Sequence, residues 1–174
     1  MSDQQLREIT LGAMLDEAIA AHPDNDAVVY ADREFRLTYK EFGEVVDTLA
    51  KGLMAMGIQK GEKVAVWATN IPYWVALQFA TAKIGAIQLT VNTNYRNAEL
   101  EYLLQQSEAE NLFLIGGWRD IDYLQTVYDL VPELKSQQRE FLKTERFPHL
   151  KRVFFLGPEK HRGLFSIPEL EAMS

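Results

Sequence analysis

The chain has 174 residues, of which 47% are hydrophobic and 25% are charged, a composition typical of one globular domain. Its net charge of −7 argues against a nucleic-acid partner, which would need a basic face on the protein. With no cysteine, it contains no disulfide, no thiolate metal site and no cysteine nucleophile.

The amino-terminal segment and the hydropathy pattern predict no targeting or membrane segment. Residues 1–20 carry Asp3, Arg7, Glu8, Asp16 and Glu17, so they contain no apolar signal core. No window approaches about 18 uninterrupted apolar residues, which predicts no membrane span. We therefore expect a cytoplasmic protein.

The first part of the chain predicts a helix, a hairpin and a second helix. Apolar residues follow helical spacing from Leu11, and "AVVYADREFRLTY" reads as two strands around a turn at Asp32 and Arg33. "TYKE" then forms a capping box, in which Thr38 and Glu41 start a helix that we expect to end at Gly57.

Two buried strands and their helices follow. "KVAVWA" (63–68) has the continuous apolar pattern of a strand that is buried on both faces of a parallel sheet. Asn70 and Pro72 begin a helix that runs to about Ile84. A second buried strand, 86–91, leads into the polar segment "VNTNYR" (91–96), which we call the elbow, and Asn97 is expected to cap the next helix.

Strand and helix continue to alternate to about residue 156. "NLFLI" (111–115) predicts a third strand, a helix is expected from Asp120 to Leu130, and "KRVFFLG" predicts a fourth strand. This alternation predicts an α/β fold with a parallel sheet and helices on both faces. We expect one unit, 1–174, with a helix and hairpin in 1–38, the alternating core in 39–156 and a tail in 157–174.

The tail begins a helix that it barely continues. "SIPE" (166–169) is a second capping box, with Pro168 in its first turn, but only a few residues follow it. We expect either that the chain belongs to something longer, or that these residues form a short frayed turn.

A search for catalytic motifs finds none. G-x-G-x-x-G, G-x-x-x-x-G-K-[ST] and G-x-S-x-G are all absent, and "GG" at 116–117 is weak evidence for a ligand. His22, His149 and His161 lie too far apart for a metal motif. Asp120 and Asp122 are interpreted as helix caps. We predict no catalytic residue and no metal site.

Aromatic residues near the first core strand are interpreted as core. Trp67 sits near the end of that strand and Trp74 in the helix that follows. At strand and helix spacing, an aromatic side chain is more often buried than part of a ligand wall.

Three segments together resemble adenylate-forming (AMP-binding) enzymes, in particular acyl-CoA synthetases that activate fatty acids. "LTYKEF" matches the family's L-[TS]-Y-x-E-L element, and "GIQKGEKVAV" matches G-[IV]-x-x-G-D-x-V-A-[IV] with Glu62 in place of the usual Asp. "AKIGAIQLTVN" matches L-K-x-G-A-x-x-x-P-[IL]-[DN], although many members have a proline near Val91. The resemblance covers roughly residues 10–174, and the sequence of the elbow is similar to that of the fatty acyl-CoA synthetase branch of the family.

The resemblance implies a reaction for which this chain lacks the main parts. The family converts a carboxylate and ATP to an acyl-adenylate and then forms a thioester with CoA, using Mg. Its phosphate loop of the T-S-G-T-T-G-x-P-K kind does not occur in this sequence. We therefore expect the amino-terminal part of a longer enzyme, with the remainder of that enzyme as its partner, and a chain that is inactive and binds no cofactor alone.

The resemblance also places the elbow along the tunnel that the pantetheine arm of CoA enters. It implies a tunnel wall of Asn92, Thr93 and Asn94, and a weaker contact from Arg119 to a CoA phosphate. An elbow beyond the carboxyl end of a parallel strand is where α/β folds bind ligands. The alternative is that these asparagines only satisfy the backbone of a turn.

Two other classes of function stay open. One is a stand-alone α/β binding or interaction module that has lost the catalytic elements. The other is a flavodoxin-like nucleotide binder, which needs a phosphate loop that is absent. Exposed apolar surface on an incomplete unit should also favour self-association. The sequence does not define the acyl chain length.

Overall fold

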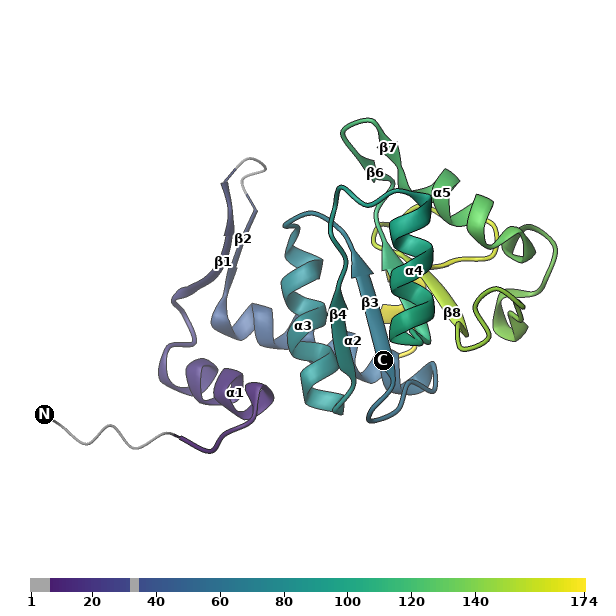
Figure 1. The fold of residues 1–174 in the computed structure, drawn as a ribbon. Helices are drawn as coiled ribbons and strands as arrows, with labels where there is room; N and C mark the ends of the chain where they lie inside the picture. The colour runs from purple at the N-terminus through teal and green to yellow at the C-terminus, as the bar shows by residue number, and fades with distance from the viewer. Residues whose placement is uncertain (1–6, 32–34) are drawn as a thin grey trace, which may run out of the picture.

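The computed structural model describes residues 7–31 and 35–174, so the turn predicted at Asp32 and Arg33 lies outside the described residues (Figure 1). Its centre is a five-stranded parallel sheet of order β4-β3-β5-β8-β9. The strands are β3 (Lys63–Trp67), β4 (Ile87–Thr90), β5 (Asn111–Leu114), β8 (Arg152–Phe155) and β9 (Phe165–Ser166).

The chain changes direction across this sheet at β3. Strand β4 follows β3 in sequence and pairs on one side of it, while β5 pairs on the other side, so that Val66 lies opposite both Thr90 and Phe113. All pairs in the sheet are parallel. The predicted α/β fold with a parallel sheet is confirmed, and the order places a topological switch point between β3 and β5.

Helices cover both faces of the sheet, as predicted. One core packs under α1 (Leu11–Ala21), α2 (Tyr39–Ala55), α3 (Pro72–Ile84) and α6 (Ile167–Glu171). The other packs under α4 (Asn97–Ser107), α5 (Tyr123–Leu130) and the 3-10 helix η2 (Pro132–Lys135). Strand β3 supplies both cores, because Val64 and Val66 face one and Ala65 and Trp67 face the other.

Two antiparallel hairpins accompany the sheet. The first pairs β1 (Asp26–Tyr30) with β2 (Phe35–Thr38), and the second pairs β6 (Gly117–Trp118) with β7 (Ile121–Asp122). Figure 1 shows both hairpins at the end of the molecule toward which β3 points. The sequence predicted the first hairpin and missed the second.

Local capping chemistry agrees with the sequence at both predicted boxes. The Thr38 N–H donates to Glu41 Oε2 at 2.8 Å, and the Glu41 N–H donates to Thr38 Oγ1 at 3.3 Å. In the second box the Ser166 N–H donates to Glu169 Oε2 at 2.9 Å. Gly57 ends α2 at φ 80°, a left-handed conformation that glycine adopts without a Cβ clash.

Three local predictions were wrong. Strand β4 is not buried, since it is an edge strand that pairs with β3 alone, and Ile87 is 48% exposed. Asn97 does not cap α4; Arg96 occupies the cap position, and its N–H donates to Glu99 Oε2 at 3.0 Å. The helix expected from Asp120 begins at Tyr123, because the short hairpin takes up the preceding residues.

The terminal helix α6 is packed rather than frayed. Leu170 is buried, and its backbone lies so close to α2 that a Cβ on Gly52 would be 2.3 Å from the Leu170 carbonyl oxygen.

The helices within residues 7–31 and 35–174 were also compared with the requirements of a membrane span. None of them combines the length and the apolarity needed to cross a membrane.

Candidate functional site at the carboxyl edge of the sheet

The elbow follows the carboxyl end of β4, and two aromatic side chains hold its backbone. The rings of Trp67 and Tyr123 stack with centroids 3.6 Å apart. Trp67 Nε1 donates to the Asn92 carbonyl at 3.1 Å, and the Tyr123 hydroxyl donates to the Thr93 carbonyl at 2.6 Å. The backbone of the elbow is therefore fixed from the core that lies under α4 and α5.

A side chain of the elbow also stabilises the elbow backbone. Asn92 Oδ1 accepts a hydrogen bond from the Asn94 N–H at 2.9 Å, which is the turn role that the sequence left open for it. Asn92 and Asn94 are exposed and Thr93 is half-buried. The amide nitrogen of an asparagine still offers donors to a ligand, so the turn role and a binding role are compatible.

Arg119 lies in the neighbouring β6–β7 hairpin, which an ion pair joins to the elbow. Arg96 Nη2 lies 2.6 Å from Asp120 Oδ2, and Asp120 directly follows Arg119. The Arg119 side chain is exposed, and its backbone has a positive φ of 54°. Its guanidinium lies 5.8 Å from the Trp118 ring centroid. The structure thus brings the loops of all four predicted site residues together. Of the two predicted caps, Asp122 caps α5, whereas Asp120 serves in this ion pair.

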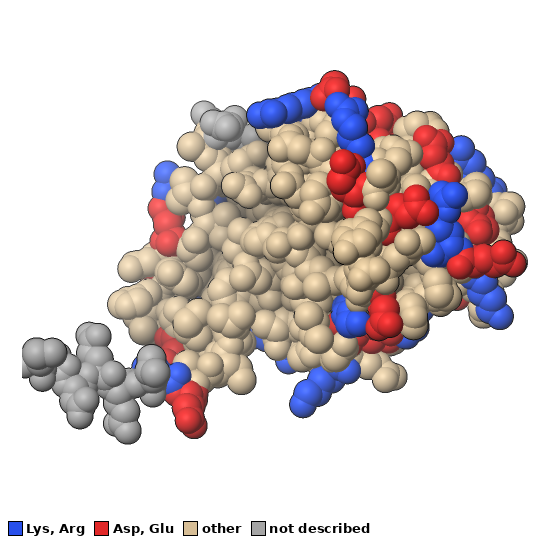
Figure 2. All heavy atoms as spheres, viewed as in Figure 1, with Lys and Arg blue, Asp and Glu red and all other residues tan. Residues whose placement is uncertain are grey.

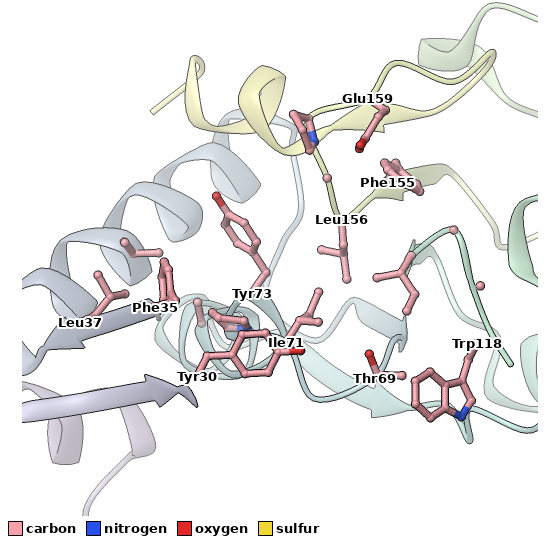
Figure 3. A pocket seen from close by; sticks show the side chains of 18 of the residues that line it. Tyr30, Phe35, Leu37, Thr69, Ile71, Tyr73, Trp118, Phe155, Leu156 and Glu159 are labelled. Carbon is pink, nitrogen blue, oxygen red and sulfur yellow. The ribbon is translucent and has the colours of Figure 1, made fainter. Parts of the chain in front are cut away.

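A cavity of about 810 Å³ lies at the carboxyl edge of the sheet, at the switch point between β3 and β5. Figure 3 shows Tyr30, Phe35 and Tyr73 on one side of it and Trp118 on the other. None of the four predicted site residues lines it. Its lining comes from the first hairpin, α2, the start of α3 and the segments after β3, β5 and β8, namely Tyr30, Phe35, Leu37, Phe42, Val45, Thr69, Ile71, Pro72, Tyr73, Ala76, Ile115, Gly116, Gly117, Trp118, Phe155, Leu156, Gly157, Pro158 and Glu159.

Sequence reasoning missed this cavity because its walls come from segments far apart in the chain. The "GG" at 116–117 was the available signal, since both glycines line the cavity. A Cβ on Gly116 would meet nothing within 4 Å, so this glycine borders open space. Burial, with a smaller effect from Glu171, raises the pKa of Tyr73 to about 12. The Tyr73 hydroxyl therefore stays protonated and donates to Glu171 Oε1 at 3.1 Å.

Charged side chains form a separate network at the amino end of the sheet. Lys151 Nζ lies 2.9 Å from Glu62 and 2.8 Å from Glu110. Burial works to raise the pKa of Glu110, but the hydrogen bonds from Lys151 and from the Lys63 backbone outweigh it, and the pKa is lowered. This network ties β3, β5 and β8 together at the end opposite the cavity, which is a structural role.

Metal ligands do not gather in the part of the chain that the structure describes. Within those residues, no group of three or more His, Cys, Asp or Glu side chains could hold an ion. Of the histidines, His149 lies 4.0 Å from Glu108, and the ring of His161 lies against Phe155. Trp67 is fully buried and Trp74 packs partly buried on the core under α3, as the sequence predicted.

The fold and the sequence define the class of this protein. The sequence pattern of the AMP-binding enzyme family matches residues 15–161. The chain belongs to the AMP-binding enzyme family, in its acyl-CoA synthetase and ligase group.

Curated relatives share this assignment. The chain is 45% identical over 170 residues to YngI of Bacillus subtilis, which is provisionally named as an acyl-CoA synthetase; the match covers 98% of this chain and 31% of YngI. It is 32% identical over 150 residues to human ACSF2, a mitochondrial medium-chain acyl-CoA ligase, covering 86% of this chain and 24% of that protein.

Solved structures have the same fold. A long-chain-fatty-acid–CoA ligase, FadD1 of Archaeoglobus fulgidus, superposes with a TM-score of 0.77 at 23% identity, over 97% of this chain and 31% of FadD1. The amino-terminal domain of FACL13 from Mycobacterium tuberculosis gives 0.70 at 19% identity, over 95% of this chain and 36% of that domain. The chain thus spans about a third of the length of these proteins or less, and it corresponds to their amino-terminal part.

Proposed function

We propose that this chain is the first part of an ATP-dependent acyl-CoA synthetase that activates fatty acids. The observation that carries the proposal is the family match over residues 15–161, combined with 45% identity to YngI along nearly the whole chain. The remainder of the same enzyme is its proposed partner, since the chain spans only 31% of YngI.

In the proposed whole enzyme, the carboxylate of the acid attacks the α-phosphate of ATP and pyrophosphate leaves. The CoA thiol then attacks the acyl carbon, and AMP leaves as the thioester forms. ATP and CoA are the co-substrates, and Mg would neutralise phosphate charge. Catalysis of such a reaction depends on positioning the phosphates and stabilising their charge.

The described residues of this chain do not fit the phosphates or the metal. The sequence has no phosphate loop, and the described lining of the cavity has no lysine or arginine to meet a phosphate. No group of three or more ligating side chains lies within the described residues. We therefore assign the chemistry to the rest of the enzyme, and to this chain the scaffold and the elbow.

The elbow is the part of this chain that we propose to contact CoA, through Asn92, Thr93 and Asn94, with Arg119 near the phosphate end. Support comes from its place beyond the carboxyl end of β4 and from the backbone that Trp67 and Tyr123 fix. A pre-organised backbone lowers the entropy cost of binding.

Testing the elbow requires an active protein. For this purpose we use a fusion that we call the extended chain, in which residues 1–174 are continued by the part of YngI that follows its matching segment. Replacing Asn94 by Ala should raise the KM for CoA by about two- to tenfold, the effect of one lost hydrogen bond, and leave kcat unchanged. Asn97→Ala, on an exposed residue at the start of α4, is the matched control. An unchanged KM for CoA in Asn94→Ala would contradict the contact.

The isolated chain should not catalyse adenylation, because the groups that bind the phosphates of ATP are proposed to lie elsewhere. The measurement is carboxylate-dependent ATP–pyrophosphate exchange by the purified chain, with saturated fatty acids of several lengths. Exchange above the rate without protein would overturn this part of the proposal.

A further inference from the structure

The cavity at the switch point is open to solvent and has aromatic walls. Phe35 on the first hairpin is 38% exposed, and Trp118 on the second hairpin is 42% exposed. Figure 2 shows charged side chains gathered over the β6–β7 hairpin and beyond it, whereas the face over α3 is nearly free of them. Large exposed aromatic side chains around a hollow are typical of a binding surface.

The chemistry of the described lining residues favours an apolar ligand over an anionic one. The described lining residues include no lysine, arginine or histidine, and Glu159 is the one carboxylate among them. A fatty-acid carboxylate or a nucleotide phosphate would find no counter-charge among these described residues and would face Glu159 instead. Apolar side chains fit this lining, because they need no counter-charge.

The position of the last residues indicates where such side chains would come from. Glu171 accepts the hydrogen bond from Tyr73, which lines the cavity, and the Ile167 N–H donates to the carbonyl of Gly157, another lining residue, at 3.3 Å. The end of this segment therefore lies beside the cavity. In YngI, the matching segment is 31% of the protein, so most of the polypeptide lies outside it.

We infer that this cavity is a docking surface for apolar side chains of the polypeptide that follows this segment in the whole enzyme, and that it is not the site of the acyl chain or the nucleotide. The inference rests on the proposed function only in taking the chain as the first part of a longer AMP-binding enzyme.

A single introduced thiol can test this, because the chain has no cysteine of its own. Gly116→Cys places a thiol at the cavity, where a Cβ meets nothing within 4 Å. The YngI part of the extended chain is used with its own cysteines replaced by serine. At a protein concentration low enough to keep the isolated chain monomeric, a maleimide should label Gly116→Cys rapidly in that chain and about tenfold more slowly in the extended chain, because a covered thiol reacts only after local opening.

The matched control is Tyr102→Cys, on α4, where Tyr102 is 66% exposed. Its labelling rate should change by less than about twofold between the two proteins, since it lies away from the cavity. Equal rates for Gly116→Cys in both proteins would overturn the inference, and so would equal slowing at both positions. If the extended chain is insoluble, the separate YngI part is added to the labelled chain, and a lack of protection of Gly116→Cys overturns it equally.

Two further measurements separate the alternatives. Protection of Gly116→Cys by myristate in the isolated chain would show a small-molecule site and overturn docking as the role of the cavity. Fatty-acid-dependent ATP–pyrophosphate exchange by the extended chain tests the proposed function independently. If Gly116→Cys is protected in the extended chain but that chain shows no exchange, docking is supported and the proposed reaction is contradicted. If the extended chain shows exchange but Gly116→Cys is not protected, docking alone is contradicted.

Discussion

At the scale of single residues, the stacked pair of Trp67 and Tyr123 determines how the elbow is presented. Each ring lies in the core and sends its polar atom to a different elbow carbonyl, at 3.1 Å and 2.6 Å. A buried aromatic residue whose polar atom is hydrogen-bonded both packs in the core and orients the group that it bonds. The pair joins β3 to α5, so the core itself orients the elbow.

Replacing Tyr123 by Phe tests this role. The stack should remain while the hydrogen bond to the Thr93 carbonyl is lost, and the free energy of unfolding should fall by about 1 kcal/mol. Urea denaturation measures the change, with Tyr102→Phe on the exposed face of α4 as the control, expected to change it by less than about 0.5 kcal/mol. Equal effects of the two variants would show that the Tyr123 hydroxyl does not stabilise the fold.

Glu169 predicts a particular pH dependence. The hydrogen bond from Arg139 is the largest cause that lowers the pKa of Glu169 to about 2; burial opposes it, and the Ser166 N–H assists. Because this folded-state pKa lies below the ordinary value of 4.5, the carboxylate stabilises the fold above about pH 4.5, and this contribution is lost as the pH falls toward 2.

Urea midpoints between pH 6 and pH 3, compared for the wild-type chain and Glu169→Gln, measure this contribution. The wild-type midpoint should fall more steeply on acidification, so that the two proteins converge at low pH. Parallel curves would contradict the ion pair between Arg139 and Glu169, whose Nη2 and Oε1 atoms lie 2.9 Å apart. Glu145→Gln, at a carboxylate outside this ion pair, serves as a control.

At the scale of elements, α2 and α6 lie in close contact at Gly52. A Cβ on Gly52 would lie 2.3 Å from the backbone oxygen of Leu170, which a small side-chain movement cannot relieve. Gly52→Ala should therefore lower the free energy of unfolding by about 1–3 kcal/mol, although alanine favours a helix more than glycine.

The matched control removes α6. In a chain that ends at Phe165, Gly52→Ala should stabilise the protein by about 0.5–1 kcal/mol, because only the helix propensity of alanine remains. Thermal or urea unfolding of the four proteins gives the coupling between the two changes. A destabilisation of equal size with and without α6 would show that the clash is not the cause.

How much of the fold follows from the sequence depends on whether the signal is local. The capping boxes at Thr38 and Ser166 and the stop at Gly57 act within one helical turn, and all three were predicted. The edge position of β4 depends on which strands flank it, so its apolar sequence predicted a burial that it does not have. The β6–β7 hairpin has two residues in each strand, too few for a periodic pattern.

The candidate site likewise has one part that the sequence could locate and one part that it could not. The polar elbow could be located from the sequence because it follows one strand, whereas the cavity could not, since Tyr30, Thr69, Trp118 and Phe155 meet only in the folded chain. The roles of Asn92 to Asn94 and Arg119 in binding CoA stay a prediction.

At the scale of the whole molecule, the open cavity with its aromatic rim should make the isolated chain self-associate. Sedimentation velocity should show oligomers that increase with protein concentration, because apolar surface that is left uncovered finds a partner in another copy. Trp118→Asp should weaken this association, and Tyr102→Asp, at a residue 66% exposed on α4, should not. A single monomeric species at the highest concentration would contradict the expectation.

We propose that this chain is the scaffold of the first part of an acyl-CoA synthetase. The most direct measurement is fatty-acid-dependent ATP–pyrophosphate exchange by the extended chain and by residues 1–174 alone, under identical conditions. We predict exchange by the extended chain and none by residues 1–174. A folded extended chain that shows no exchange with any fatty acid, or exchange by residues 1–174 alone, would contradict this proposal.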